Sequence, residues 1–345
     1  MSGPSPVGVR ALFQQRIAGD DALLRLAALR FAEAGMPAEV YADRPEELER
    51  LLRYVPEHET LPVVHLNRTV DLLTAAGRAT VEAFATRFAG RVAGLVVHDK
   101  AAMRQRTADI VEAMRELGRA RRDQPGRPIV FLEYAAGLGP SWYADLAVRL
   151  ADVELASVCI DVGHVGIEAA RHALAAARPD ADVRTLTAGS DRLPELVADV
   201  QHATRTALPT VVDLVQAVAV PRKTVHLHLH DGHPLIAGLP DHFSFLTRVP
   251  LSFAVDGRRS LDPMYGPAGL ATILRTTMQA CASGRASFTL EIHQAEGRLP
   301  IGDVPYFHHW RDLTNAERMN YWLAVLADNH LLARSAFPMP LPDGS

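Results

Sequence analysis

The chain has 345 residues, of which 48% are hydrophobic and 22% charged, a composition typical of soluble globular enzymes. The formal net charge is −4 and no concentrated basic stripe is present, which argues against a nucleic-acid partner. The two cysteines, Cys159 and Cys281, lie far apart, which argues against a disulfide framework or a cysteine zinc site. Because no apolar stretch of about 18 residues occurs and no apolar run follows Met1, we expect a cytoplasmic protein without a membrane span.

Short apolar runs alternate along the chain with longer amphipathic segments. Strands that alternate with helices form a parallel sheet, and eight such units close into a barrel. The sequence therefore predicts an α/β protein with a single (β/α)8 TIM barrel over residues 1–335 and an extended or disordered tail over 336–345. The expected strands are Val7–Phe13, Ala38–Tyr41, Leu61–Asn67, Val92–Asp99, Pro128–Tyr134, Ala156–His164, Thr224–Asp231 and Ser287–His293.

The longer segments between the strands repeat apolar residues at i, i+3, i+4 and i+7, the pattern of a helix with one buried face. After the sixth strand, Gly166–Arg222 is too long for one crossover helix, so we expect two or more helices there. After the seventh strand, Gly232–Asp262 is long enough to form a lid or side wall over the strand ends. The clearest helices are Asp21–Ala34, Pro45–Tyr54, Val70–Phe88, Met103–Ala120, Glu195–Thr206 and Asn315–Leu332.

The expected seventh strand carries a histidine at every second position, at residues 226, 228 and 230. Strand side chains alternate between faces, so the apolar residues between these histidines suit the helix layer and the imidazoles point into the barrel. Three inward histidines are costly unless they are hydrogen-bonded or bind a metal. His226 lies deepest and is expected to be a hydrogen-bonded core or supporting residue, whereas His230 near the tip is open to either role.

Acidic and histidine side chains also fall near the carboxyl ends of the other late strands, where barrel active sites assemble. A lone residue of this kind is usually a solvated rim residue or a helix cap, but six consecutive strands share the pattern. Converging carboxylates and imidazoles need a cation between them, and such donors suit Mn, Mg, Co or Zn. We expect one divalent ion and no organic cofactor. The expected ligands are Glu133, Asp161, His228 and Glu291, and further candidates for metal or substrate are His65, His98, His230 and Asp231.

The order and spacing of these motifs resemble the xylose isomerase-like barrel superfamily, which includes sugar epimerases and isomerases, inosose dehydratases and endonuclease IV. The most specific motif is Cys159–His164, which is similar to the family's Asp-x-Gly-His after the sixth strand. The resemblance extends over most of the chain, from about Val7 to Leu332. Shorter matches are Val225–Asp231 to its His-x-x-Asp segment, Phe131–Glu133 and Thr289–Glu291 to its glutamate strands, and Val97–His98 to its fourth-strand histidine.

The resemblance implies a metal-dependent isomerase or epimerase that acts on a small sugar or polyol. It implies that Glu133, Asp161, His228 and Glu291 bind the ion and that His164 orients the substrate. In the epimerase branch the two glutamates also exchange protons with substrate carbons on opposite faces. This agrees with elementary chemistry, because a Lewis acid eases proton removal beside a carbonyl and a positioned carboxylate is a suitable base.

Several alternatives stay open. His65, His98 and His164, together with the four expected ligands, also map in order onto endonuclease IV, which predicts a phosphodiester hydrolase with three zinc ions. That enzyme needs an Asp-x-His pair in the loop after the seventh strand, where this chain has Asp231-Gly232-His233, which comes too early, and the adjacent Asp241-His242. A dehydratase or lyase would use the same residues, and a non-catalytic barrel that acts as a binding or partner subunit is a further alternative. Assembly into a homo-oligomer is compatible with each of these functions. The segment Asp231–Pro234 lacks the arginine with which the epimerases grip substrate oxygens.

Overall fold

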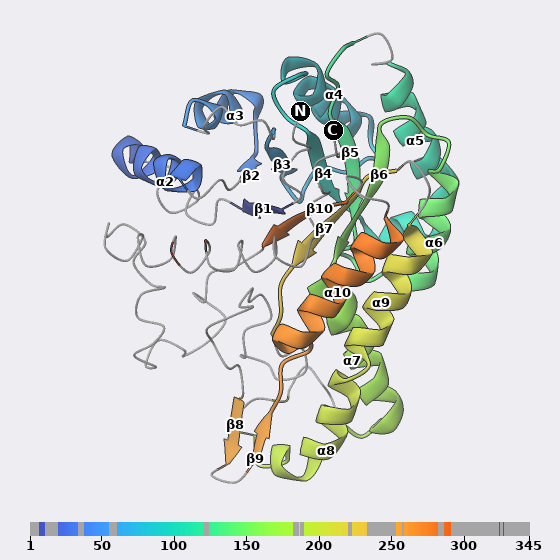
Figure 1. Cartoon of the computed structure of the whole chain (residues 1–345). Coiled ribbons are helices and arrows are strands. Elements are labelled where there is room, and N and C mark those ends of the chain that lie inside the picture. Colours follow the sequence, from blue (N-terminus) through green and yellow to red (C-terminus); the bar gives the residue numbers. More distant parts are fainter. Residues whose placement is uncertain are drawn as a thin grey trace, which may run out of the picture.

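The computed structural model shows eight parallel strands joined edge to edge in a closed ring, in the order β1-β10-β7-β6-β5-β4-β3-β2 (Figure 1). The strands of the ring are β1 (Val7–Arg10), β2 (Ala38–Ala42), β3 (Val63–Leu66), β4 (Gly94–His98), β5 (Ile129–Glu133), β6 (Ala156–Asp161), β7 (Val225–Leu229) and β10 (Ala286–Leu290). The structure describes residues 7–10, 20–33, 38–54, 61–120, 124–181, 186, 190–219, 223–232, 253–256, 259–281, 286–290, 324 and 327.

Helices connect the strands and cover the outside of the sheet (Figure 1). The alternation confirms the predicted parallel α/β architecture. The segment after β6 contains three helices, as its length indicated. The described helices are α2 (Asp21–Glu33), α3 (Pro45–Leu52), α4 (Ala75–Arg87), the 3-10 helix η1 (Ala101–Gln105), α5 (Thr107–Arg119), α6 (Pro140–Arg149), α7 (Val162–Ala177), α8 (Leu193–Thr204), α9 (Ala207–Val218) and α10 (Gly266–Ala280).

Within the expected final helix the structure describes Ala324 and Ala327, both of which are helical. The rest of that helix and the tail over 336–345 lie outside the described residues, so the eighth βα unit and the domain limits stay predictions. No helix among the described residues is long and apolar enough to cross a membrane.

The sequence analysis expected the sixth strand to extend to His164, and this boundary is wrong. The strand ends at Asp161 and α7 begins at Val162. The Asp161 carboxylate accepts a hydrogen bond from the His164 backbone N–H at 2.8 Å, which caps the first turn of the helix. The Asp-x-Gly-His motif is therefore the junction between a strand and a helix.

A second sheet, which the sequence did not predict, lies outside the ring. Strands β8 (Phe253–Asp256) and β9 (Arg259–Leu261) pair antiparallel, and they lie beside α8 at one end of the molecule (Figure 1). Asp262 and Gln201 exchange two hydrogen bonds at 2.9 and 3.0 Å, which fixes the end of this hairpin to α8.

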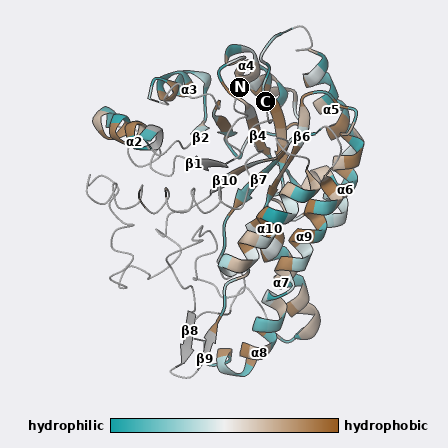
Figure 2. Cartoon of the chain, in the orientation of Figure 1, coloured by the Kyte–Doolittle hydropathy of each residue, from teal (hydrophilic) through white to brown (hydrophobic). Residues whose placement is uncertain are grey.

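The main apolar core lies between the strands and the helices, and the helices present mixed polar and apolar surfaces along their lengths, whereas the central strands are largely apolar (Figure 2). Inside the ring the apolar filling is small. Val96, Phe131 and Cys159 form a buried cluster there, with Val63 and Ile129 packed against it. The remaining interior positions that the structure describes toward the carboxyl ends of the strands are largely polar.

Candidate metal centre

Strand register brings the predicted site residues together at the carboxyl ends of β3 to β7. His98 pairs with Glu133 across β4 and β5, and Asp161 pairs with His228 across β6 and β7. Each of these four residues is the last or the last but one of its strand. Parallel strands end at the same rim of a barrel, so their inward side chains meet there.

His65, His98 and Glu133 form one group of converging donor atoms. Glu133 Oε2 lies 2.9 Å from His65 Nε2 and 3.0 Å from His98 Nε2, and the two imidazole nitrogens lie 3.2 Å apart. His65 and Glu133 are buried, whereas the His98 side chain is 24% exposed. The group is therefore accessible from the rim on the His98 side.

The tautomer of His65 shows what this group can hold. Its Nδ1 lies 3.0 Å from the Leu66 carbonyl oxygen, which can only accept, so Nδ1 carries the hydrogen. In the neutral ring Nε2 then presents a lone pair toward the carboxylate and toward His98. Electron pairs this close need a shared proton or a cation. The spacing also suits one ion, because donors about 2.0–2.2 Å from a metal lie roughly 3 Å from one another.

Glu133 joins a second donor group through its other oxygen. Glu133 Oε1 lies 3.0 Å from His228 Nδ1, and Glu133, Asp161 and His228 each offer a ligand atom within 4.8 Å of the others. Burial opposes ionisation of Glu133, but the imidazoles of His228, His65 and His98 outweigh it and hold the pKa of this carboxyl well below its usual value. Glu133 is thus an ionised, buried carboxylate shared by two groups of ligands.

Asp161 is held by the residues that follow it and by the end of β7. Its Oδ1 lies 2.5 Å from His230 Nε2, and its Oδ2 lies 3.7 Å from His164 Nε2. Burial alone would raise the pKa of Asp161, but the imidazoles of His164 and His230 have the larger combined effect. The pKa of Asp161 is therefore lowered from its usual value. A Cβ at Gly163 would lie 1.6 Å from a ring carbon of His230, so this approach requires a residue without a side chain. The His164 side chain is 35% exposed at the rim.

Asp231 was a candidate ligand, and the structure places it at the start of α10. Its carboxylate accepts hydrogen bonds from the backbone N–H groups of Gly232, Tyr265 and Gly266 at 2.8, 3.1 and 2.7 Å. Burial raises its pKa to about 6. Among the described residues, Asp231 belongs to none of the groups whose donor atoms converge closely enough for one ion.

Glu291, the fourth expected ligand, follows the last described residue of β10 and lies outside the described residues. Its role stays a prediction. Asp161, Glu133 and His228 lie within reach of one another, so the part of the expected ligand set that the structure describes shares one region.

Glu39 is the residue that the sequence analysis missed. It lies on β2 and is buried, with Oε1 3.1 Å from His228 Nε2 and Oε2 3.0 Å from His226 Nε2. Thr289 Oγ1 donates to Oε2 at 2.5 Å. Burial opposes ionisation, but His228 and His226 outweigh it and keep the pKa of Glu39 well below its usual value. The available signal was strand alternation, which puts Glu39 and Tyr41 on one face, and the Tyr41 ring does pack 4.6 Å from that of His65.

No protein-family model and no curated protein sequence matches the chain. Among solved structures it is similar to a protein from Mycobacterium smegmatis described as a xylose isomerase-like TIM barrel protein in complex with magnesium. The two chains are 13% identical, each is covered over 96% of its length, and the TM-score is 0.48. A likeness at this level concerns the course of the backbone and assigns no role to any side chain.

Proposed function

We propose that the protein is a divalent-metal-dependent isomerase or epimerase that acts on a small sugar or polyol at the carboxyl ends of its strands. The observation that carries the proposal is the position of Glu133, which turns one oxygen to His65 and His98 and the other to His228. A carboxylate among three imidazoles, with Asp161 beside them, is a mixed nitrogen and oxygen donor set that suits Mn, Co or Zn. Mg prefers oxygen donors and would suit a subset of these residues that contains fewer imidazoles.

Different residues of the site would bind the ion, accept a proton and orient the substrate. Glu133, Asp161 and His228, together with Glu291, would hold the ion, and His65, His98 and Glu133 form an alternative set. When bound, a divalent ion supplies Lewis acidity that eases removal of a proton beside a carbonyl. In the pattern that the resemblance implies, Glu133 would accept such a proton, and Glu291 would act from the other side of the substrate. His164 is partly exposed beside Asp161 and would orient a substrate hydroxyl.

The test combines metal analysis with a carbon-bound proton assay. Elemental analysis of the purified protein should find a divalent ion at one per chain. Incubation with keto sugars and inositol derivatives in heavy water should then give metal-dependent deuterium incorporation at carbon. A protein that binds no divalent ion, or that leaves every substrate unlabelled with the ion bound, would remove the proposal. Loss of water from a labelled product would instead assign a dehydratase that uses the same residues.

Hydrolysis of a phosphodiester is the second candidate, and a specific observation favours it. The two donor groups share Glu133 through different oxygens, and a bridging carboxylate suits two ions that together stabilise the attacking and leaving oxygens. The net charge of −4 argues against a DNA substrate. Two or more zinc ions per chain, together with cleavage of a simple aryl phosphodiester, would favour this reaction over isomerisation.

A further inference from the structure

A carboxylate from the far side of the barrel supports the centre. Glu39 on β2 reaches His226 and His228 on β7, although β1 and β10 separate these strands in the ring. The contact therefore crosses the barrel interior. Both carboxylate oxygens are occupied, one by His228 and the other by His226 and Thr289. A buried carboxylate is tolerated only with such partners.

The Glu39 contact engages one ring nitrogen of His228, and the other nitrogen faces Glu133. Carboxylate oxygens face both ring nitrogens of His228, Glu39 Oε1 at 3.1 Å from Nε2 and Glu133 Oε1 at 3.0 Å from Nδ1, so in the absence of an ion either nitrogen can donate. An ion that takes the place of the proton between Nδ1 and Glu133 would leave the hydrogen on Nε2, where Glu39 accepts it. Metal-binding histidines typically donate their other N–H to a carboxylate or carbonyl, which fixes the ring and raises its basicity. His65 shows the same arrangement with the Leu66 carbonyl.

We propose that Glu39 is a positioning residue, which holds His228 with Nδ1 toward Glu133 and thereby prepares this half of the metal centre. The proposal rests on the proposed metal-dependent function. In this proposal Glu39 acts through His228, and its oxygens stay engaged with two imidazoles and a hydroxyl group. The rival arrangement is an ion bound by Glu39, His65 and His228 themselves, whose donor atoms also lie within 4.8 Å of one another; it would use Nε2 of His228.

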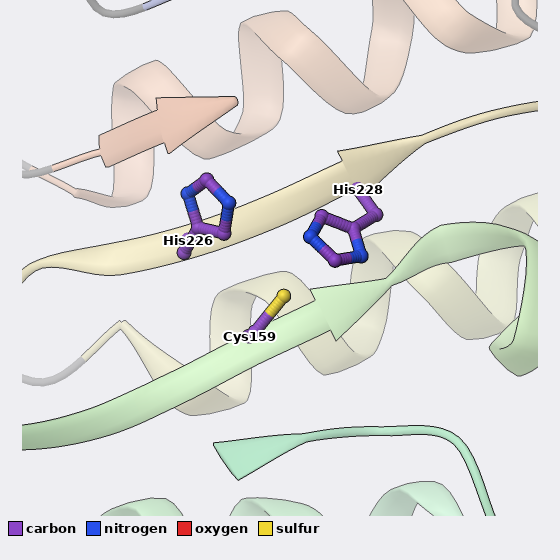
Figure 3. A group of neighbouring side chains, drawn as sticks. All are labelled: Cys159, His226 and His228. Atoms are coloured by element: carbon purple, nitrogen blue, oxygen red, sulfur yellow. The ribbon is translucent and has the colours of Figure 1, made fainter. Parts of the chain in front are cut away.

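A different metal group around His228 is less well supported. Figure 3 shows the Cys159 side chain pointing from β6 toward the rings of His226 and His228 on β7, and their donor atoms lie within 4.8 Å of one another. However, His226 Nδ1 is engaged by Ser287 Oγ at 2.7 Å and its Nε2 by Glu39. Burial also raises the pKa of the Cys159 thiol to about 12, which opposes formation of the thiolate that binds metals.

The test compares Co(II) binding by the metal-free full-length protein and two variants. Glu39→Gln keeps the shape of the side chain and removes its charge, and it should weaken Co(II) binding by about 10–100-fold, as expected when the outer partner of a ligand histidine is replaced. Ser287→Ala is the matched control, because it removes a hydrogen bond from the same polar layer without touching His228. The dissociation constant of this control should stay within about twofold of wild type. Circular dichroism and thermal unfolding establish that each variant is folded.

Long-range proton–nitrogen NMR of the Zn(II)-loaded wild type gives a readout that does not depend on a variant. The proposal expects His228 to bind through Nδ1 with its hydrogen on Nε2, and Glu39→Gln should mix the two tautomers. Binding through Nε2 would overturn it, as would wild-type affinity in Glu39→Gln. If wild type binds neither ion, the proposed function fails as well, whereas equal binding by wild type and both variants removes the role of Glu39 alone.

Discussion

Asp99 allows a quantitative test of how burial at the rim of the barrel changes the pKa of a carboxyl group and, through it, the stability of the protein. It follows β4 directly and is 2% exposed. Its Oδ1 accepts hydrogen bonds from the backbone N–H groups of Ala135 and Ala136, at 2.9 and 2.5 Å, and so ties the end of β4 to the loop after β5. Within the described part of the chain, Oδ2 has no hydrogen-bond partner. Burial raises the pKa of Asp99 from 3.8 to about 6.

The raised pKa of Asp99 sets both the sign and the size of the effect on stability. The folded carboxyl group binds its proton more tightly than the unfolded one, so the contribution is fully present below pH 3.8 and is lost as the pH rises through 6. A shift of about two units corresponds to about 3 kcal/mol. Asp99→Asn removes this titration while its amide oxygen can still accept from Ala135 and Ala136.

The assay is urea unfolding of the metal-free wild type and Asp99→Asn in EDTA at several pH values between 4.5 and 8. The difference in unfolding free energy between variant and wild type should move in favour of the variant as the pH rises, by about 2 kcal/mol over this range, because about 1 of the 3 kcal/mol is already lost at pH 4.5. Any constant cost of the amide cancels in this comparison. Asp145→Asn, on the outside of α6, controls for the loss of one surface carboxyl group. A difference that stays level across the range, or moves in favour of wild type, would refute the reasoning.

Three further predictions concern the centre and its supports. Glu133→Gln should reduce Co(II) affinity by more than about 100-fold, since it removes charge from both donor groups; a titration that matches wild type would contradict the assignment of this ligand. Gly163→Ala places a methyl group 1.6 Å from the His230 ring and should lower the unfolding free energy by about 1–3 kcal/mol, so an unchanged melting temperature would disprove the close approach. Asp231→Asn turns an amide N–H toward backbone donors and should destabilise by about 1–3 kcal/mol, whereas normal stability with lost activity would indicate a substrate role for Asp231 instead.

The strands and the inward histidines could be predicted because both follow from alternation. In β7 the residues between the histidines are apolar and buried in the outer core, and His226 and His228 turn toward the interior, as a period of two requires. The same rule placed Glu133 and Asp161 on inward faces. Each of these residues lies in a strand that is long enough for the alternation of its side chains to show which face of the sheet the residue occupies.

The end of β6 could not be predicted by alternation, because Asp161 serves two structures at once. As a strand residue it points inward, and as a helix cap it accepts the His164 N–H. The glycine between them admits the His230 ring, which arrives from a segment 67 residues away in the chain. A close approach of this kind depends on the closure of the sheet, which a single motif does not contain.

Glu39 was missed for a related physical reason. In sequence it is one acid in a five-residue strand near a turn, where a charged residue is usually solvated. Its partners lie 187 and 189 residues away, on a strand that is not adjacent in the ring. The interactions that justify burying this carboxylate therefore exist only after the barrel has closed.

The buried polar side chains inside the ring, such as Glu39, His226 and His228, stabilise the fold less than apolar side chains could. A buried ion pair such as Glu39 with His226 or His228 is often no more stable than apolar residues of the same volume, and replacement can stabilise a protein by about 1–4 kcal/mol. The small apolar cluster of Val96, Phe131 and Cys159 beside it shows that this interior can be filled without charge. Because the outer core between strands and helices is extensive, it can hold the barrel together around an interior layer that contributes little by itself. A buried layer of charge that contributes little to stability is what the proposed roles of these residues, as ligands and their supports, would require.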